Sequence, residues 1–237
     1  GMEIVDTDYA SQKNFDCFSS PEGNCDAVAE WCIGTLISLR RNIVLASEQV
    51  KQSSWVREAN RGPELKGKTV GIIGYGNTGQ AFASLLSSFG VRVLAHDKYK
   101  KGFGVGYVVE SGLEEIMGEA DIISFHLPLS SETRHYADDH FFRKLKKKPF
   151  LLNSSRGSIL ETSALISALD KEQIAGAGID VLENEQLMSY SELEKEQFRN
   201  LTSRTNLIIT PHIAGYSHEA LFKMAEVILQ KLKAARY

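Results

Sequence analysis

Apolar residues are arranged along the chain in two ways, as short uninterrupted runs and as longer segments with apolar residues at three- and four-residue steps. The first arrangement is typical of strands buried on both faces of a sheet, and the second is typical of helices. The runs predict strands at 69–76, 91–96, 121–125, 150–153, 176–181 and 207–210. The stepped segments predict helices at 81–90, 113–117, 139–147, 163–169 and about 217–233. Six or seven buried strands alternating with helices predict an α/β fold with a doubly wound parallel sheet.

The front of the chain carries one long helical pattern and little else. Apolar residues recur at helical steps from Asp26 to Val44, and Asn24 precedes them as a helix-start residue. Apolar residues cover more than one stripe of this helix, so we expect it to serve its own core or to lie between domains or against a second subunit. Residues 2–20 form no self-sufficient unit, and a short extended piece is expected at 16–18.

Composition limits the possible function classes. The 237 residues contain 43% apolar and 24% charged residues, which suits one large α/β domain, or one plus a partial second, and excludes disorder, collagen and coiled coil. A net charge of −3 and a pI near 6.1 argue against attraction to nucleic acid or to an anionic membrane. No apolar run is long enough for a transmembrane helix. We therefore expect neither nucleic acid nor a membrane as a partner.

The N-terminal residues and the cysteines indicate a cytoplasmic protein. The start of the chain lacks the basic and apolar segments of a signal peptide, and Gly1 ahead of Met2 indicates an expression-tag remnant. Three cysteines lie within the first 32 residues, and their odd number favours reduced thiols. Cys25 and Cys32 do not have the spacing of a metal site, so we expect no metal and interpret them as core residues.

A glycine-rich segment, Gly74-Tyr75-Gly76-Asn77-Thr78-Gly79, joins the first predicted strand to the helix that follows. Gly74 permits a tight turn, Gly76 lets the backbone approach a pyrophosphate over the helix N-terminus, and Gly79 allows the helix to pack closely on the strand. Asp97 ends the second strand, 18 residues after Gly79, where a carboxylate can accept hydrogen bonds from both ribose hydroxyls of NAD. A glycine-rich turn without a ligand is the alternative, but the ordered context favours a Rossmann-type NAD-binding domain. The same carboxylate would repel the 2′-phosphate of NADP.

Three kinds of polar side chain follow the later strands, at the sheet edge that also carries the glycine-rich loop. They are a cation, Arg156, carboxylates at Glu183 and Glu185, and an imidazole, His212, directly after Pro211. A guanidinium can hold a substrate carboxylate, and an imidazolium oriented by a carboxylate can donate a proton to a forming alkoxide. Each residue alone is more often a surface or structural residue. Their convergence beside a dinucleotide loop favours hydride transfer to a carbonyl.

Over residues 21–225 these features resemble the D-isomer-specific 2-hydroxyacid dehydrogenases, in particular the phosphoglycerate and erythronate-4-phosphate dehydrogenase branch. Several runs carry the resemblance in the same order along the chain. They are Gly23-Asn24, Ala27–Glu30, Gly67–Gly74, Asn153–Gly157, Gly178–Val181 and Thr210–Gly215.

The resemblance implies roles for individual residues. Arg156 binds the substrate, His212 is the acid/base, and Glu185 is its carboxylate partner, because the family's glutamate lies five residues after Asp180. Asn24 lies at a hinge near the substrate. The implied cofactor-binding residues come from the glycine-rich loop and the strand ends: Gly74, Gly76, Asn77, Thr78, Gly79, Asp97, His126, Pro128, Ser155, Asp180 and Gly215. Of these, Asp180 would contact the nicotinamide carboxamide, and His126 and Pro128 would flank the adenosine.

The resemblance also implies a domain organisation and a departure from it. Residues 23–215 correspond to the NAD-binding domain, including an interdomain and dimerisation helix, and the segment around Trp55 resembles a dimerisation arm. Residues 1–22 resemble a remnant of a substrate domain whose main part precedes this chain, and 216–237 resemble the helix that returns to it. A homodimer is expected. Gln186 stands where the family usually has proline.

Two functional hypotheses follow. The first is an NAD-dependent oxidoreductase that interconverts a 2-hydroxy acid and a 2-oxo acid, with such an acid as its small-molecule partner. The second is a catalytically impaired, truncated paralogue that acts as an NAD-binding, dimerising module or a gene remnant. A short-chain reductase is poorly supported, because Tyr99 and Tyr190 both lack a lysine four residues on.

Overall fold

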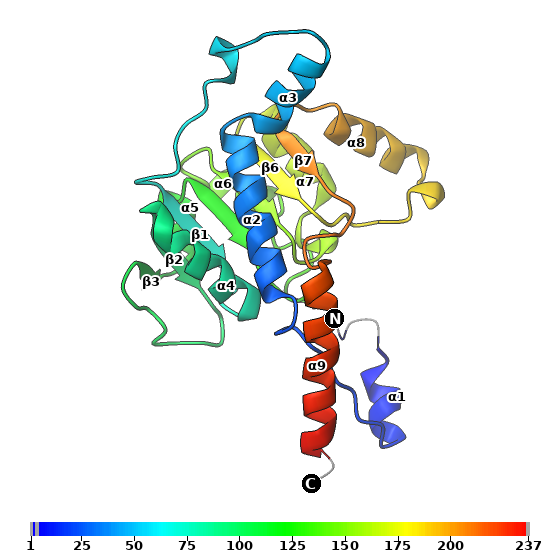
Figure 1. Cartoon of the computed structure of the whole chain (residues 1–237). Coiled ribbons are helices and arrows are strands. Elements are labelled where there is room, and N and C mark those ends of the chain that lie inside the picture. The colour runs from blue at the N-terminus through cyan, green and yellow to red at the C-terminus, as the bar shows by residue number, and fades with distance from the viewer. Residues whose placement is uncertain (1, 3–4, 236–237) are drawn as a thin grey trace.

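The computed structural model describes residue 2 and residues 5–235 (Figure 1). At its centre lies a seven-stranded sheet in the order β3-β2-β1-β4-β5-β6-β7, with every neighbouring pair parallel. The strands are β1 (Thr69–Ile73), β2 (Arg92–His96), β3 (Val108–Glu110), β4 (Ile122–Phe125), β5 (Phe150–Asn153), β6 (Gly176–Ile179) and β7 (Leu207–Ile209). The order reverses between β1 and β4, which confirms the doubly wound parallel sheet and makes this the switch point at which such folds bind ligands.

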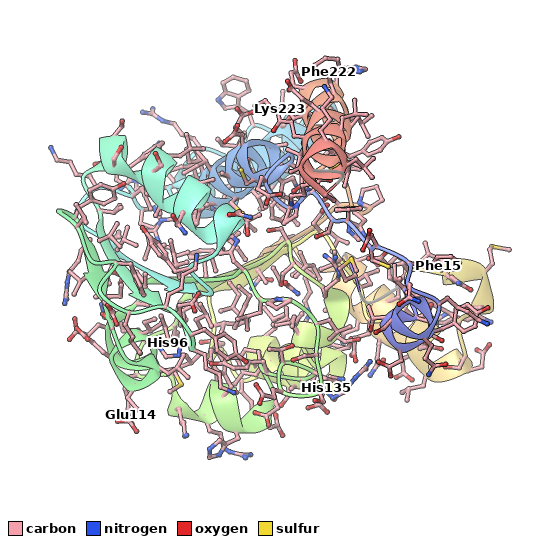
Figure 2. All side chains as sticks on the ribbon, turned by 90° about the horizontal axis from the view of Figure 1, so that it is seen from below. Phe15, His96, Glu114, His135, Phe222 and Lys223 are labelled. Atoms are coloured by element: carbon pink, nitrogen blue, oxygen red, sulfur yellow. The ribbon has the colours of Figure 1, made fainter. Side chains whose placement is uncertain are left out.

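Helices cover both faces of the sheet, and side chains fill the space between the layers (Figures 1 and 2). One face packs against α2 (Cys25–Arg40) and α4 (Asn77–Leu86). The other packs against α5 (Leu113–Glu119), α6 (Asp139–Lys144), α7 (Thr162–Asp170) and the end of α8 (Glu192–Thr202). Adjacent residues of one strand serve opposite faces, as Ile72 and Ile73 of β1 do, because side chains alternate along a strand. This explains why the buried strands read as continuous apolar runs.

The prediction of one long helix from Asp26 to Val44 is wrong in one respect, because this segment forms two helices. The first, α2, ends at Arg40, and α3 (Ile43–Lys51) follows in a new direction (Figure 1). Between them Asn42 has a φ of +52°, a left-handed conformation that asparagine adopts more readily than most residues and that stops a helix. The chain therefore turns away from the sheet at Asn42, and α3 has no buried residue.

Other boundaries also differ from expectation. The helix expected at 139–147 ends at Lys144, and the piece expected to be extended at 16–18 has no regular structure. Among the α-helices and strands of the described residues, α1 (Thr7–Gln12), β3 and α8 were not predicted. The start of α8 has a readable signal, a capping box in which Ser191 and Glu194 bond each other's backbone N–H groups.

Of the cysteines, only Cys32 is the core residue that we expected. It is fully buried, and burial raises the pKa of its thiol to about 12. Cys25 is partly buried and Cys17 is exposed, and all three are free thiols. The expectation for Gly1 lies outside the described residues.

Below the sheet, the segment between α1 and α2 passes next to the C-terminal helix (Figure 1). On α9 (His218–Ala235), Lys231 donates hydrogen bonds to the Ser19 carbonyl at 2.7 Å and to the Glu22 carboxylate at 2.9 and 3.0 Å. Phe15 and Phe222 lie on the outer side of this region and are largely exposed (Figure 2). Among the described residues, no helix has both the length and the apolar character needed to cross a bilayer.

The packing of α2 on the sheet requires a glycine in β6. A Cβ added at Gly178 would lie 2.3 Å from Thr35 Cγ2 and 3.0 Å from Leu152 Cδ2. We expect Gly178→Ala to lower the free energy of unfolding in urea by about 1–3 kcal/mol, because both neighbours are packed. Gly34→Ala is the matched control on α2, where an added Cβ meets nothing within 4 Å. It should raise the same free energy by about 0.5–1 kcal/mol, and equal effects of the two would contradict this packing.

Candidate active site

The glycine-rich loop lies between the end of β1 and α4, at the switch point of the sheet. Gly74 has a φ of +97°, and a Cβ there would lie 2.2 Å from the His126 carbonyl oxygen. A Cβ at Gly79 would lie 2.1 Å from the Gly74 carbonyl oxygen, so α4 packs directly on the turn. Both glycines are required by the fold itself.

Gly76 differs from the other two glycines, because the chain itself does not require it. A Cβ at this position would meet nothing within 4 Å, and Gly76 caps α4 without any side-chain hydrogen bond. The first N–H groups of α4, which begins with Asn77 and Thr78, are therefore without a side-chain cap. An open space over an uncapped helix N-terminus fits the pyrophosphate of a dinucleotide.

Asp97 lies directly after β2, beside this loop. Its carboxylate accepts hydrogen bonds from the backbone N–H groups of Tyr75 at 2.9 Å, Tyr99 at 2.9 Å and Lys100 at 3.0 Å. Burial alone would raise the pKa of Asp97, but these donors and the Lys100 charge outweigh it and hold the pKa below its usual value. Asp97 is therefore a fixed negative charge next to the loop. Tyr75 is in turn stacked on Phe103, with ring centroids 4.5 Å apart.

His126 meets the glycine-rich loop through its backbone and not through its side chain. Its imidazole is buried, forms a hydrogen bond with Ser124 Oγ at 2.8 Å and packs 5.7 Å from the Phe82 ring. The part of His126 that meets the glycine-rich loop is its carbonyl group, beside Gly74. Its side chain is thus a core group, and Pro128 is the more exposed residue of the implied pair.

His212 and Glu185 are brought together from two different loops. His212 Nδ1 lies 2.9 Å from Glu185 Oε2, and both side chains are about half exposed, at 49% and 45%. Glu183 turns elsewhere, since it pairs with His135 Nε2 at 2.6 Å and accepts a hydrogen bond from the Thr162 N–H. Of the two candidate carboxylates, Glu185 alone contacts His212.

The turn that carries His212 is built on Asp180, which is 1% exposed. Its carboxylate accepts hydrogen bonds from the Ile213 N–H at 2.9 Å, the Ala214 N–H at 2.7 Å and the Thr210 hydroxyl at 2.5 Å. The Asp180 carbonyl also accepts a hydrogen bond from the His212 N–H at 2.8 Å. His212 has a φ of +56°, a conformation that costs about 1–3 kcal/mol and persists only where surrounding contacts enforce it.

Thr210 and Trp31 were not recognised from the sequence. The Trp31 indole N–H donates a hydrogen bond to Thr210 Oγ1 at 3.0 Å, so a chain of hydrogen bonds runs from α2 through Thr210 to Asp180. The sequence contains no signal for this series of hydrogen bonds, because the Thr210 hydroxyl and the Trp31 indole lie on distant segments.

Arg156 lies after β5 on a turn held by Asn153. The Asn153 Oδ1 accepts hydrogen bonds from the N–H and the hydroxyl of Ser155, and its Nδ2 donates to the Arg156 carbonyl. One Arg156 nitrogen donates to the Ser155 carbonyl at 2.6 Å. A Cβ at Gly157 would lie 1.9 Å from the Leu182 carbonyl oxygen, so this turn lies against the segment that leads to Glu185.

The remaining predicted residues, Asn24 and Gly215, are neighbours. A Cβ at Gly215 would lie 2.5 Å from Asn24 Nδ2, so the start of α2 meets the turn after His212. Next to this turn is a cavity of about 360 Å³, and Asp180, Glu185 and His212 all line it. The structure therefore gathers a dinucleotide loop, a cation, and a carboxylate–imidazole pair at the carboxyl ends of adjacent strands.

Comparisons with known proteins relate the chain to one family. The sequence model of the family described as "D-isomer specific 2-hydroxyacid dehydrogenase, NAD binding domain" matches residues 33–214. The chain is 35% identical to the glyoxylate reductase of Thermofilum pendens, over 99% of the chain and 69% of that protein. It is 33% identical to the D-lactate dehydrogenase of Escherichia coli, over 98% of the chain and 72% of that protein.

Solved structures give the same result. The D-lactate dehydrogenase from Aquifex aeolicus, crystallised with NAD and lactic acid, superimposes with a TM-score of 0.88 at 28% identity. The match covers 99% of this chain and 73% of that one.

The buried His126 predicts a pH dependence of stability. Burial lowers the pKa of His126 from 6.5 to about 4, so the unfolded chain takes up a proton at a higher pH than the folded chain does. The resulting loss of stability is absent above pH 6.5, grows as the pH falls, and is complete near pH 4. We expect His126→Gln to remove about 3 kcal/mol of the decrease in unfolding free energy across this range. Chemical denaturation at a series of pH values measures the difference, and parallel pH profiles for the two proteins would contradict the assignment.

Proposed function

The chain belongs to the D-isomer-specific 2-hydroxyacid dehydrogenase family, and from this membership we propose that it interconverts a 2-hydroxy acid and a 2-oxo acid with NAD as the redox partner. The observation that carries the proposal is the His212–Glu185 contact at the same sheet edge as the glycine-rich loop. Hydride transfer to a carbonyl needs an acid at the oxygen, and a carboxylate-oriented imidazole can supply the proton.

The proposed chemistry divides among a few side chains. NADH supplies the hydride when it is bound. With Nδ1–H donated to Glu185, His212 presents Nε2 to the substrate, and from this atom a proton passes to the carbonyl oxygen. In the oxidising direction Nε2 accepts the proton from the hydroxyl. Glu185 fixes the ring orientation and stabilises the imidazolium.

Arg156 and Asn24 are proposed to bind the substrate. The Arg156 guanidinium would form paired hydrogen bonds with the substrate carboxylate and polarise the adjacent carbonyl. Its position after β5 is supported by the Asn153 hydrogen bonds that fix the turn. Asn24 lies against Gly215 beside the His212 turn, which places an amide near the same substrate.

The cofactor is proposed to lie across the switch point. Gly76 and the N–H groups of Asn77 and Thr78 would bind its pyrophosphate, and Asp97 would bind the adenosine ribose. Asp180 already accepts three hydrogen bonds from the His212 turn. We therefore propose that Asp180 mainly positions this turn and offers the nicotinamide carboxamide only its remaining lone pair. Ser155, Pro128 and the His126 carbonyl would complete the walls of the site.

The segments at the two ends of the chain are proposed to belong to a second, substrate-binding unit. The hydrogen bonds from Lys231 to Ser19 and Glu22 support this assignment, because they join the N-terminal segment to α9.

A cytoplasmic location is also proposed. It is supported by the three free cysteines, because thiols stay reduced in that compartment.

We expect His212→Gln to lower kcat for reduction of 2-oxo acids by about 10²–10⁴-fold, because the variant lacks the proton donor. A panel of 2-oxo acids with NADH, monitored by loss of NADH absorbance, measures this, and a fluorescence titration should show unchanged NADH binding. His218→Gln, an exposed histidine on α9, is the control and should retain activity. Full turnover in His212→Gln would contradict the assigned acid. Saturable NADH binding without turnover by the natural chain would favour the impaired-paralogue alternative.

A homodimer formed through the α2–α3 region is also proposed. Ile43, Val44 and Val50 of α3 are about half exposed, and Trp55 beyond it is 84% exposed, which is unusual for a tryptophan in a monomer. We expect sedimentation equilibrium to give a dimer, and Trp55→Ala to raise the dissociation constant at least tenfold, since buried tryptophans dominate interface energies. Met188→Ala, at a fully exposed apolar side chain elsewhere, should leave the dissociation constant unchanged. A monomer at all concentrations would refute the proposal.

A further inference from the structure

The position of Glu185 depends on the backbone that carries it. Its carboxylate is about half exposed, and in the described part of the chain its hydrogen-bond partner is His212. A long side chain at such an exposed position samples several rotamers unless its backbone is fixed. The residues on either side of Glu185 therefore matter to the proposed chemistry.

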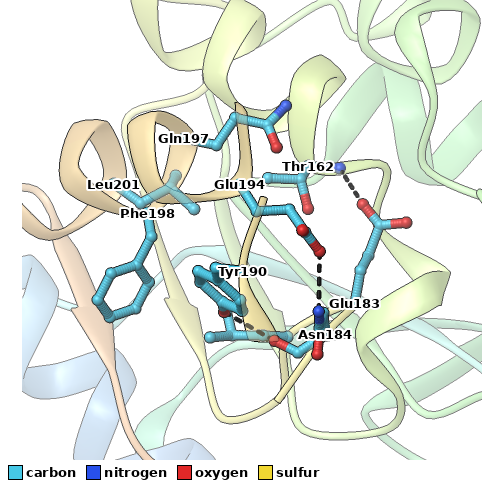
Figure 3. Close-up of a pocket in the computed structure, with 9 residues that line it drawn as sticks. Thr162, Glu183, Asn184, Tyr190, Glu194, Gln197, Phe198 and Leu201 are labelled. Atoms are coloured by element: carbon cyan, nitrogen blue, oxygen red, sulfur yellow. Dashed lines mark hydrogen bonds between the residues drawn. The ribbon is translucent and has the colours of Figure 1, made fainter. Parts of the chain in front are cut away.

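Glu183, on the N-terminal side, is held at two points. Its carboxylate accepts a hydrogen bond from the Thr162 N–H at 2.8 Å and pairs with His135 Nε2 at 2.6 Å. Thr162 is the first residue of α7, so Glu183 ties this segment to the N-terminus of that helix (Figure 3).

Asn184, which directly precedes Glu185, fixes the backbone on the C-terminal side of Glu185. Its side-chain oxygen, its side-chain nitrogen and its carbonyl all form hydrogen bonds. Its Oδ1 accepts a hydrogen bond from the Gln186 N–H at 2.9 Å, which closes a tight turn around Glu185. Its Nδ2 donates to Glu194 Oε1 at 2.8 Å, and its carbonyl accepts from the Tyr190 hydroxyl at 2.7 Å. These contacts lie at one side of a pocket of about 180 Å³ between α7 and α8 (Figure 3).

Glu194 connects this turn to a rigid element. Its Oε2 accepts hydrogen bonds from the N–H and the hydroxyl of Ser191, while its Oε1 accepts the one from Asn184. Hydrogen bonds from Ser191 and Asn184 hold the pKa of Glu194 at about 2, so it remains an acceptor at all working pH values.

We infer that Asn184 and Glu194 are positioning residues that fix Glu185 against His212, and this inference rests on the proposed function. The Asn184–Glu194 hydrogen bond anchors the Glu185 turn to the start of α8. Without this bond the turn loses its side-chain link to the start of α8, so Glu185 is held less firmly and selects the Nδ1–H form of the His212 ring less strongly.

The hydrogen-bond polarity allows a sharp test. Glu194→Gln can still accept from Ser191, but its amide then faces the Asn184 amide, so two donors meet. Asn184→Asp places two carboxylates against each other. The double variant Asn184→Asp with Glu194→Gln restores a hydrogen bond of reversed polarity, and the new carboxylate at position 184 can still accept from the Gln186 N–H. Glu192→Gln, two residues before Glu194 on α8 and bonded to Lys195, is the control.

The first readout needs no turnover. Two-bond ¹H–¹⁵N correlation spectra of the neutral imidazole report which ring nitrogen carries the proton, and the His212 signals are assigned by their loss in His212→Gln. We expect mainly the Nδ1–H form in the natural chain, a several-fold smaller fraction of it in both single variants, and recovery in the double variant. Unchanged tautomer fractions in the single variants overturn the inference, and so does a loss that the double variant does not restore.

The second readout is steady-state kinetics. We expect each single variant to lower kcat about tenfold with KM for the 2-oxo acid unchanged, since a displaced catalytic group affects the chemical step. The double variant and the control should regain or keep the natural kcat. If the natural chain has no turnover, the proposed function fails, while the tautomer measurement still decides the positioning role.

Discussion

Asp180 is the buried charge on which the geometry of the site depends. A carboxylate that is 1% exposed must find donors, and it finds them in the Thr210 hydroxyl and the N–H groups of Ile213 and Ala214. These bonds force the intervening His212 into a left-handed backbone conformation and aim its ring at Glu185. A cost in backbone strain is thus offset by the solvation of one buried charge.

The parallel sheet supplies the second constraint. Because the carboxyl ends of parallel strands meet at one edge, turns from β5, β6 and β7 bring Arg156, Glu185 and His212 to the same side as the glycine-rich loop. Gly74 and Gly79 are required because the backbone packs closely against them, while Gly76 leaves an open space that the chain itself does not fill. The fold therefore brings the glycine-rich loop and the proposed catalytic groups to one edge of the sheet.

Sequence patterns predict those structural features that depend on residues close together in the chain. Buried parallel strands read as apolar runs, and the glycine-rich loop and Asp97 have fixed spacing, so the fold and the cofactor end were predictable. The break at Asn42 was not, because an apolar helical pattern continues across it. The burial of His126 and the bond from Trp31 to Thr210 depend on distant segments, which periodicity does not report. Short elements such as β3 and α1 carry too few residues for a clear period.

The hydrogen bond between Trp31 and Thr210 also bears on how the protein is made. These residues are separated by 179 positions, so the bond cannot form until all the residues between them have been synthesised. A nascent chain that has released only β1 to β5 can assemble the cofactor loop, but Asp180 and its donors are still absent. The site is therefore completed late during translation, and a chain interrupted shortly before Thr210 would have the glycine-rich loop without His212.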